Sequence, residues 1–261
     1  MNEAQIAFLT LYLIYIVIIV IFHDTLIMKP FRLLTTFLHE SSHAIACWIT
    51  CGSVQAIRVY DNEGGVTSYY GGCRALIIPA GYVGAAIWGS MFVMFSGGRQ
   101  TATGAACALI TMLLLSLCFA PNRTMVGLNL FYAIITAIFI YLEWYVFTPI
   151  LAYVVLFYGA FVGIEAITDV YQDTVKRTVL RSDAYACYEI CPCCLPRCVG
   201  IQWAACTIIL QVTGVAIAML QLSNECNNVG WWECLGGEGD IGETFWSLEQ
   251  QATHNIESLF Y

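Results

Sequence analysis

Seven long apolar stretches constrain what this chain can fold into. They cover residues 5–22, 31–51, 75–96, 104–120, 126–144, 148–167 and 201–221. A helix needs about 20 mainly apolar residues to cross the hydrocarbon core of a bilayer. Only 11% of the residues are charged, which leaves too little polar surface to solvate a globule of this length. We therefore predict an all-α, polytopic membrane protein with about seven transmembrane helices, embedded in the lipid bilayer.

The distribution of charge bears on partners and orientation. A formal net charge of −8 argues against a nucleic-acid partner, because phosphate binding requires a basic surface. Cytoplasmic loops carry an excess of Lys and Arg, and with seven spans most of these residues fall on the side of the N-terminus. We therefore predict a cytoplasmic N-terminus and a non-cytoplasmic tail over residues 222–261, which is acidic and contains no Lys or Arg.

A polar motif interrupts the second apolar stretch, where residues 39–43 read HESSH. Residues four apart share one face of a helix, so His39 and His43 can present both imidazoles to one metal ion. Glu40 then lies beside the first ligand, where its carboxylate can take a proton from a zinc-activated water as a general base. Such side chains cost on the order of 2–3 kcal/mol each in a bilayer unless they face a polar cavity. The motif therefore predicts a catalytic zinc site.

A catalytic zinc site takes three protein ligands, so one more is needed. Carboxylates near or within the later spans are the candidates. They are Glu143, Glu165, Asp169, Asp173 and Asp183. Each is also explained as an interfacial acid or a helix cap, and the residues alone leave the choice open.

Two features flank the motif along the chain. Between the second and third stretches, alternating residues surround DNEGG, which predicts a short β-hairpin, with an ordinary exposed loop as the alternative. The exposed edge of such a hairpin could accept a substrate segment as an added strand. In the third stretch, Gly81, Ala85 and Gly89 form a small-residue stripe that permits close helix contact, either with the HExxH helix or as generic packing.

HESSHAIACWITCG, the segment after it and PAGYVGAAIWGS together resemble the site-two protease type of intramembrane zinc metallopeptidase, in particular the B-like branch of the M-fifty peptidase family. The resemblance covers residues 31–90 and, more loosely, 148–198. It implies a Zn²⁺ ion held by His39, His43 and an aspartate from a later segment, best matched by Asp169, with Glu40 as the base. The Asn-Pro and Leu-Asp-Gly signature of the better-characterised members is absent.

The resemblance also implies a domain organisation and an activity. Residues 1–221 form the membrane-embedded metallopeptidase-like domain, with the HExxH helix at about 31–51, the partner helix at 75–96 and a cytoplasmic Cys-rich loop at 168–200. The implied reaction is hydrolysis of peptide bonds in a membrane-spanning protein substrate. The alternative is a catalytically inactive membrane scaffold or transporter that retains a metal-binding site.

The predicted depths of the site residues conflict with one another. Counted from Arg32 at 1.5 Å per residue, His39 lies about 10 Å from the outer surface, whereas Asp169 follows the inner end of the sixth span. The two meet only if a helix is broken or tilted, the HExxH helix lies deeper, or the span count is off by one. Glu143 is better matched in depth.

Seven of the cysteines form two groups outside the apolar stretches. The first is Cys187, Cys191, Cys193, Cys194 and Cys198, whose juxtamembrane position favours palmitoylation or plain packing. A second zinc site is less favoured, because the spacing differs from that of a two-pair zinc site. Cys226 and Cys234 in the tail are expected to form a disulfide.

Overall fold

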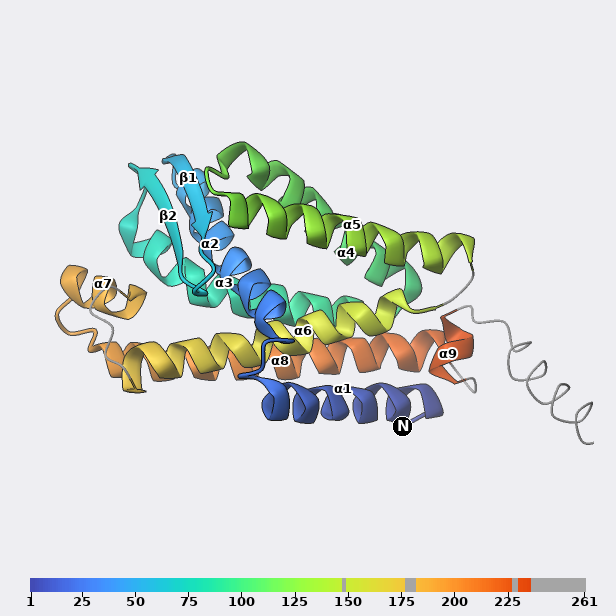
Figure 1. Ribbon diagram of the computed structural model, residues 1–261. Helices are drawn as coiled ribbons and strands as arrows, with labels where there is room; N and C mark the ends of the chain where they lie inside the picture. Colours follow the sequence, from blue (N-terminus) through green and yellow to red (C-terminus); the bar gives the residue numbers. More distant parts are fainter. Residues whose placement is uncertain (147–148, 177–181, 227–229, 236–261) are drawn as a thin grey trace, which may run out of the picture.

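The computed structural model describes residues 1–146, 149–176, 182–226 and 230–235. Within them the chain forms nine α-helices, two short helical turns of other types and one hairpin (Figure 1). In order these are α1 (Glu3–Phe22), α2 (Lys29–Ile49), β1 (Ser53–Val59), β2 (Gly65–Tyr70), α3 (Arg74–Phe95), α4 (Arg99–Ser116), η1 (Leu117–Phe119), α5 (Arg123–Tyr145), α6 (Leu151–Tyr171), η2 (Gln172–Lys176), α7 (Asp183–Ile190), α8 (Pro196–Glu225) and α9 (Trp231–Cys234).

Six of the described helices are long and apolar enough to cross a membrane: α1, α3, α4 with η1, α5, α6 with η2, and α8. This confirms a polytopic, mostly helical membrane protein. The remaining predicted span, α2, has 21 residues but does not meet the same measure of apolarity. Its polar residues, including Arg32 and Glu40, are buried against neighbouring elements, and its apolar side chains Leu34, Phe37 and Leu38 face the protein core.

The first two helices explain why the span count differs by one. Figure 1 shows that α2 begins beside the end of α1 and continues towards the end of the bundle that carries the hairpin and α7. The start of α1 and the short helix α9 lie at the opposite end. Taking these six described helices as the spans puts the N-terminus and α9 on the same side of the membrane. The seven-span prediction had placed them on opposite sides.

The predicted hairpin is present and lies against α2. β1 and β2 pair antiparallel, with Ile57 opposite Thr67 and Val59 opposite Gly65. The turn is closed by two hydrogen bonds: the N–H of Glu63 donates to the carbonyl of Tyr60 (3.0 Å), and the N–H of Tyr60 donates to the carbonyl of Gly64 (2.8 Å). Glu63 adopts φ = 67° in this turn.

The helix α3 lies at the centre of the bundle, between α2, α6 and α8. Its small-residue stripe allows backbones to approach closely: a Cβ on Gly89 would lie 3.0 Å from the backbone nitrogen of Gly163 on α6. A Cβ on Gly81 would lie 2.3 Å from Nε2 of His39 on α2. The stripe therefore contacts two different helices, and one of them is the HExxH helix.

The two ends of the described chain are joined to one another. The side-chain amide of Asn2 donates to the carbonyls of Leu222 (3.0 Å) and Cys226 (3.1 Å) at the end of α8. The predicted disulfide between Cys226 and Cys234 is present. It holds α9 so that the ring of Trp231 packs edge-on against Phe8 of α1, with 5.1 Å between ring centroids.

Candidate metal centre

Two imidazoles from successive turns of α2 point at the same spot. The Nε2 atoms of His39 and His43 are 3.1 Å apart. The Nδ1 atom of His43 lies 2.7 Å from the backbone carbonyl of Ile77 on α3. Because a carbonyl can only accept, Nδ1 carries the proton and Nε2 of the neutral ring is left free to bind a metal.

The third donor comes from α7. The Oδ2 atom of Asp183 lies 3.0 Å from Nε2 of His39 and 3.1 Å from Nε2 of His43. Burial raises the pKa of Asp183, but the charge and hydrogen bonds of the two imidazoles lower it more, so the net pKa is well below its usual range. The donor atoms of the three residues all lie within 4.8 Å of one another. Two imidazole nitrogens and an ionised carboxylate are the donor set of a catalytic zinc site.

The space beside these donors is kept open by a glycine of α3. A Cβ on Gly81 would lie 2.3 Å from Nε2 of His39 and 2.5 Å from Nε2 of His43. A side chain at this position would therefore push into the space that an ion bound by the two imidazoles would occupy. The donor set and this opening both fit a zinc ion.

Among the described residues, this group of donor atoms contains Asp183 and not Asp169. Asp169 projects from α6 into the same cavity. Asp183 reaches the histidines because it begins the short helix α7, which folds back against α3. The depth conflict of the seven-span prediction also disappears, because α2 begins beside the end of α1 and continues towards the end of the bundle that carries α7 (Figure 1).

The other candidate carboxylates have different partners. Glu165 pairs with His23 at 2.7 Å, and Asp173 accepts a hydrogen bond from the hydroxyl of Tyr82. Glu143 pairs with Arg99 at 3.0 Å. It lies near the end of α5, at the end of the bundle opposite the hairpin (Figure 1).

The predicted general base is held by the second strand. Glu40 is 6% exposed. The hydroxyl of Thr67 lies 2.7 Å from its Oε2 atom. A Cβ on Gly65 would lie 2.5 Å from both Cγ and Oε1 of Glu40, so β2 covers the carboxylate closely. No sequence motif pointed to Gly65 or Thr67, because their role depends on how the hairpin folds over α2.

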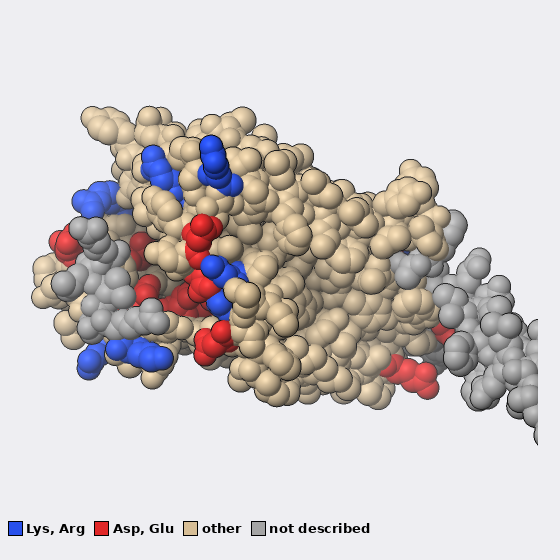
Figure 2. Space-filling view, viewed as in Figure 1, with Lys and Arg blue, Asp and Glu red and all other residues tan. Residues whose placement is uncertain are grey.

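A cavity of about 760 Å³ connects these residues. It extends from His39, His43 and Asp183 past β2 to the turn between α1 and α2. Figure 2 shows Asp and Glu side chains gathered in a hollow on this face, with Lys and Arg around it. The site is therefore a polar chamber within an otherwise apolar bundle. Because the polar side chains face this chamber and not lipid, the cost of placing them in a membrane protein is reduced.

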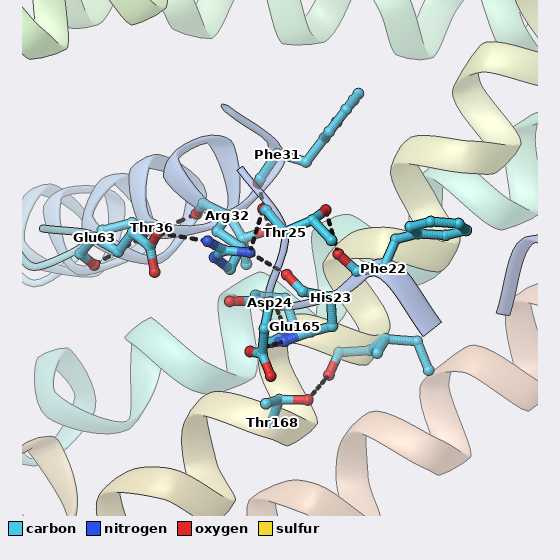
Figure 3. A network of polar contacts seen from close by, with 12 residues as sticks. Phe22, His23, Asp24, Thr25, Phe31, Arg32, Thr36, Glu63, Glu165 and Thr168 are labelled. Carbon is cyan, nitrogen blue, oxygen red and sulfur yellow. Dashed lines mark hydrogen bonds and ion pairs between the residues drawn. The ribbon is translucent and has the colours of Figure 1, made fainter. Parts of the chain in front are cut away.

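A polar network lies at the other end of the cavity (Figure 3). Arg32 of α2 contacts Oε1 of Glu63 at the hairpin tip through Nη2 (2.8 Å) and donates to the carbonyl of His23. Thr36 donates to the carbonyl of Glu63 (3.1 Å). The hydrogen bond to Glu165 raises the pKa of His23 to about 9. The network fixes the hairpin tip to α2 and the α1–α2 turn to α6.

Comparison with known proteins agrees with this geometry. A family model described as Peptidase M50B-like matches residues 12–214. The chain belongs to the Peptidase M50B-like family. The match spans α2, the hairpin, α3 and α7, and so includes every residue of the metal centre. Membership confirms the resemblance predicted from the sequence. Together with the six apolar helices, it shows that the chain is an integral, multi-pass membrane protein of an intramembrane metallopeptidase family. Neither the curated proteins nor the solved structures gave a match to this M50B-like chain.

Proposed function

We propose that this protein is an intramembrane zinc metallopeptidase that hydrolyses peptide bonds in membrane-spanning protein substrates. One observation carries the proposal: two Nε2 atoms and Oδ2 of Asp183 converge in a polar cavity beside Glu40. In place of the Asp169 implied by the resemblance, we propose Asp183 as the third ligand, together with His39 and His43.

The protein's own groups have separate roles in this reaction. A bound zinc ion would polarise the scissile carbonyl and make a water more acidic. Glu40 takes the proton of the attacking water and later delivers it to the leaving amine. Thr67 holds one carboxylate oxygen of Glu40, which fixes the carboxylate relative to α2.

Within the described residues, the edge of β2 away from β1 pairs with no further strand, and it offers a place for the substrate backbone. Tyr60 and Gly64 form a hydrogen-bonded pair at the end of the hairpin. In an antiparallel pair of strands, hydrogen-bonded and non-hydrogen-bonded residue pairs alternate. The N–H and C=O groups of Gly65, Thr67 and Tyr69 therefore point away from β1. These three residues line the cavity. A substrate helix must unwind before cleavage, and an added strand would satisfy its freed peptide groups.

Strand addition is tested at the edge, away from Glu40. Tyr69→Pro removes an outward N–H, whereas Tyr69→Phe retains it and serves as the matched control. We expect Tyr69→Pro to lose most cleavage activity while keeping its zinc. Equal activity of the two variants would rule out a hydrogen-bonded substrate strand at this position.

The proposed function is tested by zinc content and cleavage together. Protein purified in detergent should contain about one zinc per chain at this centre, lost in His39→Ala and in His43→Ala. In proteoliposomes with a library of transmembrane peptides, mass spectrometry should detect products from the wild type. Glu40→Gln should retain zinc and give no products. Zinc binding with no cleavage by the wild type would instead support the scaffold or transporter alternative.

A further inference from the structure

A second group of potential metal ligands lies outside the centre described above. The segment CPCC joins α7 to α8, and the Sγ atoms of Cys191, Cys193 and Cys194 lie within 4.8 Å of one another. The Sγ atoms of Cys191 and Cys193 are 2.7 Å apart. None of the three sulfur atoms belongs to a disulfide.

The backbone holds these thiols in a tight turn. The N–H of Cys191 donates to the carbonyl of Cys187 and ends α7 (2.9 Å), and the N–H of Cys194 donates to the carbonyl of Cys191 (2.8 Å). Pro192 occupies the second position of that turn, where its fixed φ favours the turn before any ligand arrives. Pro196 then starts α8. Little further ordering is needed to bring the three sulfur atoms together, which favours binding.

We propose that Cys191, Cys193 and Cys194 bind one thiophilic metal ion, Cu(I) or Zn²⁺, at a site separate from the zinc centre of α2. Thiolates are the preferred donors of both ions. Three thiolates suffice for Cu(I), whereas Zn²⁺ takes four ligands and would add a water. Binding releases the thiol protons to solvent.

The convergence of the sulfur atoms favours a metal over the palmitoylation suggested by the sequence. Acyl chains need separate paths from each sulfur into the lipid. Chains on two sulfur atoms 2.7 Å apart would crowd one another. A shared ion uses the same proximity, because one ion must contact all three atoms.

The position of the thiols links them to the first centre. α7 has eight residues; Asp183 begins it, and Cys191 caps its other end. Cys194 also packs against a small core that contains Tyr82 and Trp203. The ring of Tyr82 lies 4.7 Å from that of His39, centroid to centroid. An ion at the thiols would therefore fix α7 and, through it, the carboxylate of Asp183.

Metal titration of the full-length protein in detergent tests the site. With Co²⁺ as the probe for Zn²⁺, we expect a sulfur-to-cobalt charge-transfer band, which the oxygen and nitrogen donors of α2 and α7 cannot give. Buffered Cu(I) forms the second arm of the titration. Either ion should bind at about one equivalent with sulfur ligation, and Cys191→Ser/Cys193→Ser should abolish that binding but retain the His-site metal. Cys194→Ser alone provides a second, milder variant.

The matched control is Cys107→Ser/Cys118→Ser. It removes two exposed thiols that are distant in sequence from the cluster, and it should leave the titration unchanged. The proposal is overturned if neither ion shows sulfur ligation in the wild type, or if the control loses it as fully as Cys191→Ser/Cys193→Ser. It is also overturned if mass spectrometry of protein from native membranes finds these cysteines acylated.

Discussion

The hydroxyl of Thr67 lies 2.7 Å from Oε2 of Glu40 and 2.8 Å from the backbone oxygen of the same residue. A hydroxyl has one proton to donate and two lone pairs that accept. When the Glu40 carboxylate is ionised, Thr67 can donate to it. When the carboxyl is protonated at Oε2, the oxygen of Thr67 can accept a hydrogen bond from that O–H group, and its own hydroxyl can donate to the backbone oxygen instead. One side chain can therefore satisfy both states through which a general base passes.

Thr67→Val, which keeps the shape but removes the hydroxyl, should lower kcat. A hydrogen bond to a charged group contributes about 1.5–3 kcal/mol, so we expect a loss of roughly 10- to 100-fold, with KM and zinc content little changed. Thr67→Ser should restore most of kcat. Steady-state cleavage assays measure both constants. Wild-type kcat in Thr67→Val would show that the carboxylate does not depend on this contact, whereas an active Glu40→Gln would instead remove the proposed base.

Two glycines should separate zinc binding from catalysis. The added methyl of Gly65→Ala would meet Glu40, so this variant should keep zinc and lose cleavage. The methyl of Gly81→Ala would meet the imidazole nitrogens and should lower zinc affinity by about 10- to 100-fold, a loss typical of disturbed metal surroundings. Gly104→Ala has open space around it and is the control. Equal zinc affinities in Gly81→Ala and Gly104→Ala would argue against the proposed ion position.

Two asparagine variants should identify the third ligand. Asp183→Asn should weaken zinc binding by at least about 100-fold, because changes even beyond the direct ligands cost about 10- to 100-fold. Asp169→Asn should retain the metal. Zinc titration of both proteins decides between them. The reverse result, loss of zinc in Asp169→Asn alone, would restore the assignment implied by the family resemblance.

The pair formed by His23 and Glu165 should make stability depend on pH. The hydrogen bond to Glu165 raises the pKa of His23 from 6.5 to about 9. Because the pKa of His23 is raised in the folded state, protonated His23 stabilises the folded protein fully below pH 6.5. This contribution is lost as the pH rises through about 9. The midpoint of thermal unfolding should therefore fall between pH 6.5 and 9 in the wild type. His23→Gln should show a smaller fall, and identical profiles would exclude the pair as the cause.

Six spans change the predicted side of the N-terminus and leave the predicted sides of the later loops and of α9 unchanged. Arg58, Arg74, Arg123, Lys176 and Arg197 belong to elements that place them at the hairpin end, while Arg99 begins α4 at the other end (Figure 1). Because positive charge stays cytoplasmic, we expect the hairpin end inside and both α9 and the N-terminus outside. A glycosylation tag at the N-terminus should be modified, and an impermeant maleimide should label Cys193 only after permeabilisation. An unmodified tag with prompt labelling of Cys193 would reverse the orientation.

The features that follow from local pattern were predictable from the sequence. Apolar length gave the spanning helices, alternation around DNEGG gave the hairpin, and four-residue spacing placed His39 beside His43. The third donor was not predictable in this way. Asp183 lies 144 positions from His39, and several carboxylates near the same membrane surface fit the sequence equally well. Only the fold of α7 against α3 distinguishes them.

The status of α2 shows a second limit. Hydropathy measures how apolar a segment is, but it does not record whether lipid or protein surrounds that segment. Leu34, Phe37 and Leu38 read as parts of a span and are in fact buried in the protein core. Counting α2 as a crossing puts the N-terminus on the cytoplasmic side, whereas the loops after α2 keep the sides that the sequence predicts.

The links between Asn2 and the end of α8, together with the disulfide that holds α9 against Phe8, have a mechanical consequence. The start of α1 is tied to the end of α8 and to α9, so we expect these helices to stay together at that end. Under the proposed function, we therefore expect a substrate helix to reach the chamber at another part of the perimeter. Reduction of the Cys226–Cys234 disulfide from the outer face should loosen the contact between α9 and α1 without affecting the metal centre.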